Sequence, residues 1–451
     1  MLHRFHAPRA VLCAALITMA CAQASAVTFE SFPYPNNDGF FGVANGGSAA
    51  VGYNSDGIYV LNADRSRSVI SPNSPTHAYS GAPSMSSDGR YVAAGVNGAN
   101  GHSQAGIYDR NSGAWTGLGD LGNGAYTRSG SANNSSIYQS SYANKISDDG
   151  STVVGAAAYS ATANSLANAY HAAVWRNGQV YDLNASGAGT GSSGNGSGNI
   201  LSTSADGTLV AGYTNNNDRD SYRVWTWNGS GYTQSFAPTA TNPYTGATHQ
   251  NIQVNALSAN GVWGAGGSSR NLGSKSFGPL GNAITFLPAT LWNSQTNTTT
   301  IIPFDHVIHY DDIDSMYHDP LKNMVASIAG VTNDGTVFGA FNTCLDVRCG
   351  ATILTVDTFV YSTLTGQSVT FDSYLASMGV ALSPTQHVTN IFGVSADGSA
   401  ISGYMFDTAT NQTSGFLLTN LAAVPEPGSW ALMALGLPLL VGLRRRKRSD
   451  R

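Results

Sequence analysis

The stretch GVSADGSAISG at residues 393–403 occurs almost residue for residue near the start of the chain, as GVANGGSAAVG at residues 42–52. Each stretch has an apolar start, a two-residue turn and a small-residue run that ends in Gly. Five further copies lie between them: SMSSDGRYVAAG from Ser84, KISDDGSTVVG from Lys145, STSADGTLVAG from Ser202, ALSANGVWGAG from Ala256 and GVTNDGTVFG from Gly330. Seven copies of one unit indicate a repeat architecture.

Each copy predicts a β-hairpin. Asp-Gly or Asn-Gly between short apolar runs favours a tight turn, because Gly takes positive φ and the Asp side chain caps the turn. The turn glycines are Gly47, Gly89, Gly150, Gly207, Gly261, Gly335 and Gly398. A second glycine follows about five residues later, and we expect it to let neighbouring backbones approach closely. These trailing glycines are Gly52, Gly95, Gly155, Gly212, Gly266, Gly339 and Gly403.

A second hairpin follows in the copies, most clearly in HAAVWRNGQVYDL at residues 171–183, where Asn177-Gly178 is the predicted turn. A large aromatic residue recurs in its first strand, and we expect it to fill the gap to the neighbouring unit. The first copy shows only Ile58-Tyr59-Val60 at this place.

Two hairpins in each copy amount to four strands, which bury little area alone but cover one another when stacked radially. The sequence therefore predicts an all-β fold, a β-propeller of about seven four-stranded blades over residues 27–422. Six or eight blades and an open β-solenoid remain alternatives. Val27-Thr28-Phe29 is a candidate for the strand that closes the last blade. Only two Glu and four Lys in 451 residues argue against a helical bundle.

Both ends of the chain carry targeting patterns. Residues 1–26 have a basic start, the apolar run Val11 to Ala20 and the small-residue site Ala24-Ser25-Ala26, so they predict a secretory signal peptide. Residues 424–451 contain Pro425-Glu426-Pro427, an apolar stretch at about 429–443 and a basic tail at 444–451. This stretch predicts a short transmembrane helix, and the basic cluster suits the cytoplasmic side.

The C-terminal tail resembles the PEP-CTERM sorting signal of Gram-negative bacteria. The resemblance implies export through an intermediate anchored in the inner membrane, recognition of Pro425, Glu426 and Pro427 by an exosortase, and a final place at the cell surface, at the outer membrane or outside the cell. A second resemblance, to the extracellular HAF-type repeat, rests on HAAVWRNGQVYDLN from His171 and on WTGLGDLGNG from Trp115. It implies a repeat β architecture and no catalytic site.

Charge and cysteine content agree with an exported chain. Between Val27 and Val424, 13 Lys and Arg stand against 24 Asp and Glu, a net charge of about −11 that disfavours nucleic acid as a partner. Two of the four Cys lie in the leader, and Cys344 and Cys349 remain. In an oxidising compartment their short spacing favours a local disulfide that pins one loop.

Two sets of polar residues are candidate metal sites. The turn residues Asp88, Asp149, Asp206, Asp334 and Asp397 could hold calcium, but one carboxylate per turn is more typical of turn capping. The segment 305–319 holds three His and five Asp, of which His306, His309, Asp311 and Asp314 are candidate ligands for a divalent metal. The alternative for this segment is a solvated loop, so no cofactor is required.

The sequence favours an exported surface or matrix protein with a structural or binding role, linked to exopolysaccharide and biofilm. Its expected partners are the exosortase, exopolysaccharide or surface proteins, and transiently the inner membrane. Gly/Ser/Asn-rich insertions at 185–199, 123–142 and 270–286 are candidate binding loops on the rims. The alternative is a secreted propeller hydrolase or lyase on extracellular polysaccharide that uses Asp groups near 305–319. Glu is absent between Glu30 and Glu426, so a glycosidase pair would have to be two Asp, and the non-enzymatic reading is preferred.

Overall fold

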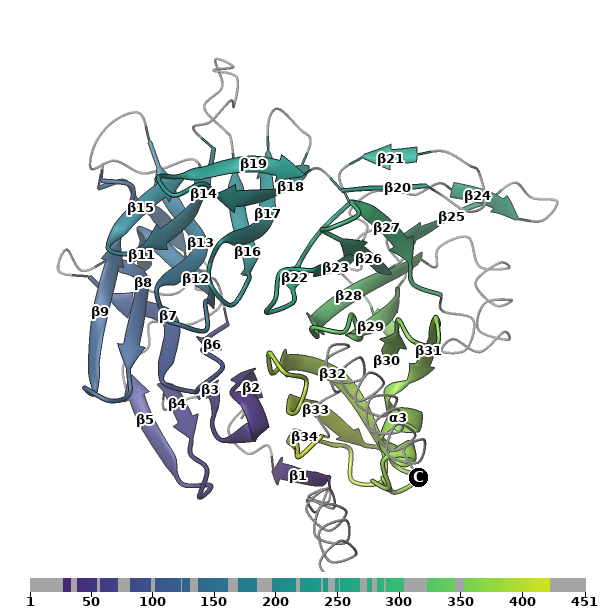
Figure 1. Ribbon diagram of the computed structural model, residues 1–451. Coiled ribbons are helices and arrows are strands. Elements are labelled where there is room, and N and C mark those ends of the chain that lie inside the picture. The colour runs from purple at the N-terminus through teal and green to yellow at the C-terminus, as the bar shows by residue number, and fades with distance from the viewer. Residues whose placement is uncertain are drawn as a thin grey trace, which may run out of the picture.

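A computed structural model of the chain shows a ring of β-sheets around a central axis (Figure 1). It describes residues 27–421, apart from gaps at 34–38, 55–56, 72–81, 99–101, 123, 130–136, 161–168, 185–196, 216–219, 237, 242–247, 251, 268–273, 278–281, 288, 304–322 and 345–352.

Six blades are four-stranded antiparallel meanders in chain order. Blades 1 to 3 consist of β2 (Gly39–Val43), β3 (Ala50–Asn54), β4 (Gly57–Leu61) and β5 (Arg67–Ser71); β6 (Ser84–Met85), β7 (Tyr91–Asn97), β8 (Ser103–Asp109) and β9 (Ala114–Gly119); and β12 (Ser141–Ile146), β13 (Thr152–Tyr159), β14 (Ala169–Arg176) and β15 (Gln179–Asp182). Blades 4 to 6 consist of β16 (Gly198–Thr203), β17 (Leu209–Asn215), β18 (Asp220–Trp227) and β19 (Tyr232–Phe236); β22 (Ala256–Leu257), β23 (Trp263–Gly267), β26 (Ala289–Asn293) and β27 (Thr298–Ile301); and β28 (Asn323–Val331), β29 (Val337–Cys344), β30 (Ile353–Ser362) and β31 (Gln367–Thr370).

Blade 7 combines the two ends of the propeller. The last copy supplies three strands, β32 (Gln386–Val394), β33 (Ile401–Asp407) and β34 (Gln412–Thr419), and the fourth is β1 (Thr28–Pro33). β1 runs antiparallel to β34, with Thr28 opposite Thr419. The prediction of seven four-stranded blades is confirmed, as is the closing strand near Val27. The expectation that every copy holds four strands is wrong for the last copy, whose outer edge is covered by β1 instead. The first copy, by contrast, does hold its second hairpin, β4–β5.

The hydrophobic core lies between the blades rather than in one central mass. Seven clusters of buried residues each join two neighbouring blades, and one of them joins blade 7 to blade 1 through Leu417 and Tyr59. Trp175, Trp225 and Trp292 are each at most 3% exposed and fill such boundaries. The expected gap-filling aromatic is therefore present, as Tyr108 also shows in blade 2, although in blades 1 and 7 the equivalent register position is aliphatic: Leu61 and Leu418.

The trailing glycines lie on the second strand of each blade, and in five blades the paired first strand carries a register shift. A Cβ added to Gly155 would lie 2.0 Å from the Tyr142 carbonyl oxygen, and one on Gly403 would lie 1.9 Å from that of Asn390. In both blades the first strand carries a bulge beside this contact. The close approach expected of these glycines is thus between paired strands, where an extra residue bends the first strand.

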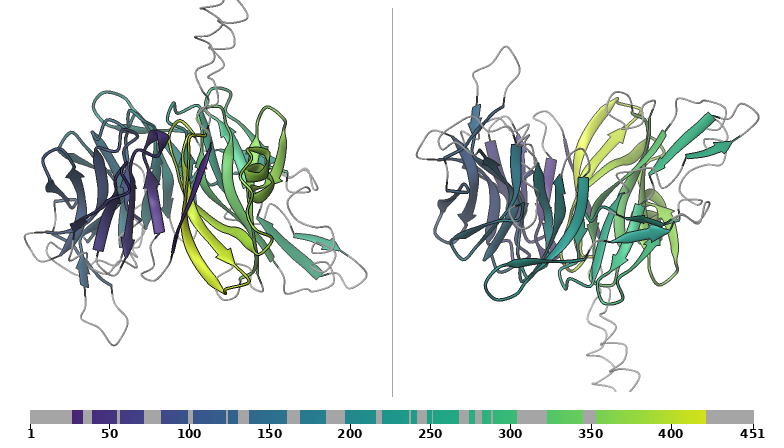
Figure 2. Two further views of the ribbon diagram at one scale, coloured as in Figure 1. Left: turned by 90° about the horizontal axis from the view of Figure 1, so that it is seen from below. Right: turned by 90° about the horizontal axis from the view of Figure 1, so that it is seen from above.

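In an antiparallel meander, successive connections lie alternately at the two ends of the strands. The ring therefore has two different faces. One face, the turn face, carries the repeat turns and the Asn177-Gly178 turn. The other, the insertion face, carries three inserted strand pairs, and one of them projects beyond the ring (Figure 2). They are β10 (Thr127–Ser129) with β11 (Ile137–Gln139), β20 (Thr239–Thr241) with β21 (Thr248–Gln250), and β24 (Ser274–Phe277) with β25 (Asn282–Leu287). Two insertions expected to be featureless loops, 123–142 and 270–286, therefore contain strands.

Among the described residues, one α-helix interrupts the all-β pattern. α3 (Phe371–Ser377) begins where the Thr370 side chain accepts a hydrogen bond from the Ser373 N–H, and its Phe371 and Leu375 are buried between blades 6 and 7. The helix closes the outer edge of that boundary.

Candidate functional site

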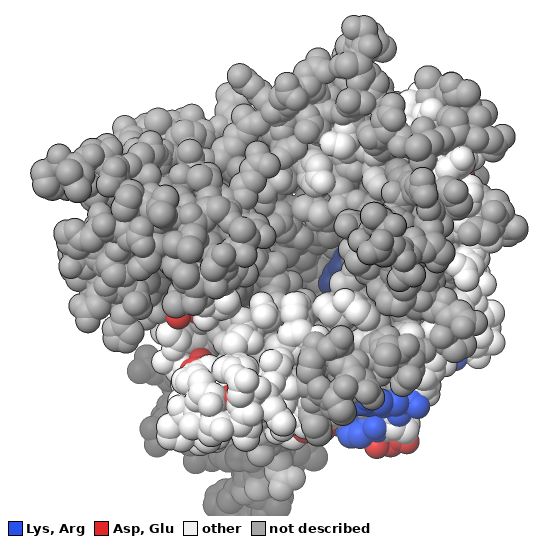
Figure 3. Space-filling model, turned by 180° about the vertical axis from the view of Figure 1, so that it is seen from behind, with Lys and Arg blue, Asp and Glu red and all other residues white. Residues whose placement is uncertain are grey.

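A cavity of about 200 Å³ lies on the axis of the ring. All seven blades contribute to its wall through their first strands and the repeat turns. Viewed from behind, the insertion face has a hollow at its middle in which atoms of a basic side chain are visible (Figure 3). The cavity is a concave feature that the ring closure creates, and ligand sites in proteins are concave.

The bulges decide which side chains reach this cavity. In each blade one residue, three positions before the Ser, Thr or Ala that starts the repeat turn, lines the cavity: Phe41, Pro83, Asn144, Leu201, Asn255, Ala329 and Phe392. In five of the blades this residue lies inside an observed register shift, which leaves it unpaired on the first strand. A bulge re-aims a side chain in this way.

Two charged side chains line the cavity among the described residues, Lys145 and Asp148, both from blade 3. Burial lowers the pKa of the Lys145 ammonium below its ordinary value, and the charge of Asp148 opposes this only in part. Burial raises the pKa of the Asp148 carboxyl, against a hydrogen bond from Ser87 and the charge of Lys145. The two do not approach within 4.0 Å of one another as an ion pair.

The repeat turns form the wall toward the turn face, and they hydrogen-bond from blade to blade. The Asp148 N–H donates to the Ala205 carbonyl at 2.8 Å, and the Ala205 N–H donates to the Ala259 carbonyl at 2.8 Å. Between blades 7 and 1 the Asp397 N–H donates to Asn45 Oδ1 at 3.3 Å. These contacts connect the turns of neighbouring blades around the cavity.

The turn carboxylates are used inside the turns. Ser86 Oγ donates to Asp88 Oδ1 at 2.7 Å and accepts from the Tyr91 N–H at 2.9 Å, while the Arg90 N–H donates to the same carboxylate. The turns at Asp149, Asp206, Asn260, Asp334 and Asp397 repeat this arrangement. The expected turn capping is therefore present in six blades. In the part of the chain that the structure describes, no three His, Cys, Asp or Glu side chains lie together as metal ligands.

The other sequence-predicted site residues fall outside what the structure describes. His306, His309, Asp311 and Asp314 lie in the gap between β27 and β28, and Pro425, Glu426 and Pro427 follow the last described residue. Cys344 ends β29, but Cys349 is in the gap after it. The metal site and the disulfide remain predictions, as does the hydrolase or lyase alternative that depends on 305–319.

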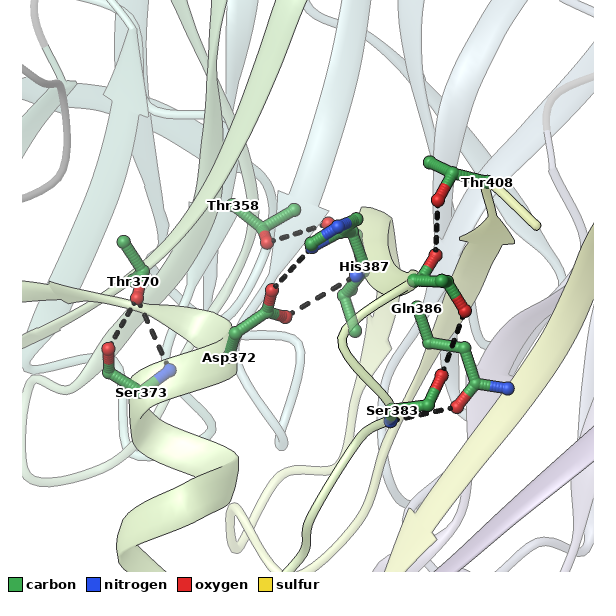
Figure 4. Close-up of polar contacts among 10 residues, drawn as sticks. Thr358, Thr370, Asp372, Ser373, Ser383, Gln386, His387 and Thr408 are labelled. Atoms are coloured by element: carbon green, nitrogen blue, oxygen red, sulfur yellow. Dashed lines mark hydrogen bonds and ion pairs between the residues drawn. The ribbon is translucent and has the colours of Figure 1, made fainter.

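Two His-Asp pairs lie away from the axis. His387 contacts Asp372 at 3.3 Å, where α3 meets β32, and the Val388 N–H donates to the same carboxylate (Figure 4). His171 contacts Asp182 at 2.8 Å across β14 and β15, under a stacked Tyr159 ring. Both pairs join neighbouring elements and neither lines the axial cavity, so we read them as structural clamps.

Sequence reasoning missed the axial cavity and its lysine. The signal was available in the alignment of the seven copies: the second residue before the turn Ser, Thr or Ala is Gly, Ser or Ala in six of them and Lys145 in the third. What the alignment could not show is that this position faces the axis.

The fold and the axial cavity together define a seven-bladed β-propeller closed by its N-terminal strand. Residues 423–448 match the PEP-CTERM protein-sorting motif, which implies processing by an exosortase and export through membrane-anchored sorting. Within the described residues, no helix has the length and apolar character to cross a membrane.

Several solved structures are similar in fold at low identity, and no curated protein matches the chain. The β-propeller domain of the Trilobed protease from Pyrococcus furiosus has 8% identity and a TM-score of 0.42 over 86% of this chain and 99% of that one. A puromycin-hydrolyzing peptidase of Mycobacterium tuberculosis has 12% identity and a TM-score of 0.43, with coverage of 89% and 58%. TolB from Acinetobacter baumannii has 14% identity and a TM-score of 0.30 over 60% of this chain and 53% of that one, so this chain spans about half of its length.

Proposed function

We propose that this chain is an exported binding protein of the cell surface or extracellular matrix, whose propeller engages exopolysaccharide or surface proteins after exosortase processing. The match of residues 423–448 to the sorting motif carries the export part of the proposal. The binding part is supported by the axial cavity and by the three inserted strand pairs on one face. The HAF-type resemblance of the β14–β15 hairpin fits an extracellular repeat protein.

The positions of the two ends of the propeller support a chain that is processed first and binds its partner afterwards. β1 begins one residue after the predicted leader cleavage site, and the sorting motif begins four residues after β34 ends. Removal of both segments would leave every blade complete. Because Thr28 pairs with Thr419, both segments leave blade 7 from the same end, at the turn face. A chain held by its C-terminal tail would present the insertion face away from the membrane.

The test is expression of the full chain in cells with and without an exosortase, followed by mass spectrometry of its C-terminus. We expect a shortened, exported form only where the exosortase is present, and retention of the intact tail when Pro425, Glu426 and Pro427 are replaced together by Ala. Identical, uncut chains in both hosts would contradict the export proposal. The exported form is then tested for retention on immobilised acidic and neutral polysaccharides, and retention on none of them would contradict the binding role.

A further inference from the structure

One position of the repeat carries a small residue in six blades and a lysine in the other. Two residues before the first turn residue, six blades carry small residues: Gly42, Ser84, Ser202, Ala256, Gly330 and Gly393. A Cβ on Gly42 would lie 2.8 Å from the backbone nitrogen of Met85 in the next blade, and one on Gly330 would lie 2.7 Å from Val394 Cβ. The space between neighbouring first strands is therefore narrow. Lys145 occupies this position in blade 3, and its side chain lines the cavity.

Three polar groups at the cavity lack a partner among the described residues. Lys145 has no hydrogen bond or ion pair, and Asp148 is the charge that acts on it. Ser84 Oγ and Asn255 Oδ1 are buried without a hydrogen bond, and Ser84 is only 3% exposed. Such unpaired groups are costly in a folded protein. Two buried atoms of this kind, together with an ammonium that lines the same cavity, point to a bound molecule that supplies the missing partners.

The types of these groups define the chemistry of that molecule. The Lys145 ammonium offers three donors and a positive charge, so it suits a carboxylate. Ser84 offers a hydroxyl that donates or accepts, and Asn255 offers an acceptor, so both suit hydroxyl groups. Two aromatic rings, Phe41 and Phe392, line the same cavity with their centroids 5.0 Å apart, and they provide an apolar surface for the carbon side of a sugar ring.

We propose that the axial cavity binds one carboxylate-bearing sugar residue, a uronate, with its carboxylate at Lys145 and its hydroxyls at Ser84 and Asn255. The cavity volume of about 200 Å³ matches one sugar ring rather than a chain. The inference rests on the proposed binding role and names its ligand class. The uronate is either the terminal residue of an acidic polysaccharide or a free sugar acid.

The experiment measures binding of D-glucuronate to the full chain by isothermal titration calorimetry, with D-glucose as the matched ligand that lacks the carboxylate. We expect glucuronate to bind at least about tenfold more tightly than glucose, and Lys145→Met to remove that preference. Arg67→Met, on the outer strand β5, is the control for loss of a positive charge and should leave binding unchanged. An oligosaccharide ending in glucuronate separates the two sources: tighter binding than the free acid assigns the polymer end, and binding of the free acid alone assigns the soluble ligand.

Two further measurements test the inference even if the Lys145→Met variant misfolds. Ser84→Ala and Asn255→Ala should each weaken binding severalfold while leaving glucuronate preferred over glucose. In the unmodified protein the affinity should fall as pH rises from about 6 to about 10, because Lys145, whose pKa burial lowers, loses its proton; the charged groups that face it are Asp148 and, beyond Asp148, Asp88. No binding of glucuronate, or equal binding of glucose, would overturn the inference. Retention of the exported chain on polysaccharide in spite of that result would leave the proposed function in place and move its site to the insertion loops.

Discussion

At the scale of single residues, the trailing glycines have a clearer role than the turn glycines. A turn Gly supplies positive φ, as at Gly150 (φ 72°), and other residues such as Asn adopt that conformation at some cost. A trailing Gly instead makes room for a carbonyl oxygen of the paired strand, which no side chain can share. It thereby permits the bulge that turns a neighbouring side chain toward the axis.

Replacement of one trailing glycine should destabilise the protein without any change in backbone φ preference. Gly155→Ala places a Cβ 2.0 Å from the Tyr142 carbonyl, so we expect a loss of about 1–3 kcal/mol in the free energy of unfolding, measured with urea. Gly231→Ala is the matched control, because a Cβ there has no atom within 4 Å, and it should change stability by less than about 0.5 kcal/mol. Equal effects at the two positions would refute the steric explanation.

At the scale of elements, the repeat hairpin is held by its own turn residues. Ser204 Oγ donates to Asp206 Oδ1 at 2.7 Å, and the Thr208 N–H donates to the same oxygen at 3.0 Å. Burial alone would raise the pKa of Asp206, but these hydrogen bonds outweigh it and hold the pKa below its ordinary value. In blade 5 the same contacts are made by Asn260, which carries no charge.

This comparison predicts different results for two substitutions at Asp206. Asp206→Ala removes the acceptor and should lower the free energy of unfolding by about 1 kcal/mol at neutral pH, whereas Asp206→Asn keeps an acceptor and should cost less. Because the folded-state pKa is depressed, the stabilisation by the carboxylate is complete above about pH 4 and is lost as pH falls through the folded-state value. Thermal unfolding between about pH 2 and 7 should therefore show a weaker acid dependence in Asp206→Asn. If the Asn variant matches the parent at every pH, the charge has no role in the turn.

At the scale of the whole molecule, ring closure depends on a strand from the opposite end of the chain. β1 covers the outer edge of β34 over six residue pairs, and Phe29 stacks on Phe416 with ring centroids 5.5 Å apart. Arg65 Nε of blade 1 donates to Glu30 Oε2 at 2.8 Å, which ties β1 to the neighbouring blade as well. Without β1, the edge of β34 would present unpaired backbone groups to other chains.

Deletion of residues 28–33 should therefore lower the melting temperature and cause association through β34, which size-exclusion chromatography with light scattering detects. A synthetic peptide with the sequence of residues 27–33 should restore a monomer when added in excess, because it supplies the missing backbone pairs. A deletion variant that stays monomeric with the melting temperature of the parent would show that β1 is dispensable for closure.

The sequence by itself determined the repeat unit, its seven copies, the turn positions and the targeting pattern at residues 424–451, because these depend on local turn chemistry and on motifs read along the chain. The closure of seven blades, which the sequence favoured over six, eight or an open solenoid, was decided by the tertiary structure. Only the tertiary structure decided that the last blade takes its fourth strand from β1, that the first strands carry bulges, and that Lys145 with Ser84 and Asn255 surrounds a cavity. The physical reason is that alternation along a strand assigns a residue to one face of its own sheet, whereas the axis exists only after seven sheets have closed into a ring. The sequence of one blade alone cannot show whether its lysine lies unpaired at the axis or is exposed to solvent.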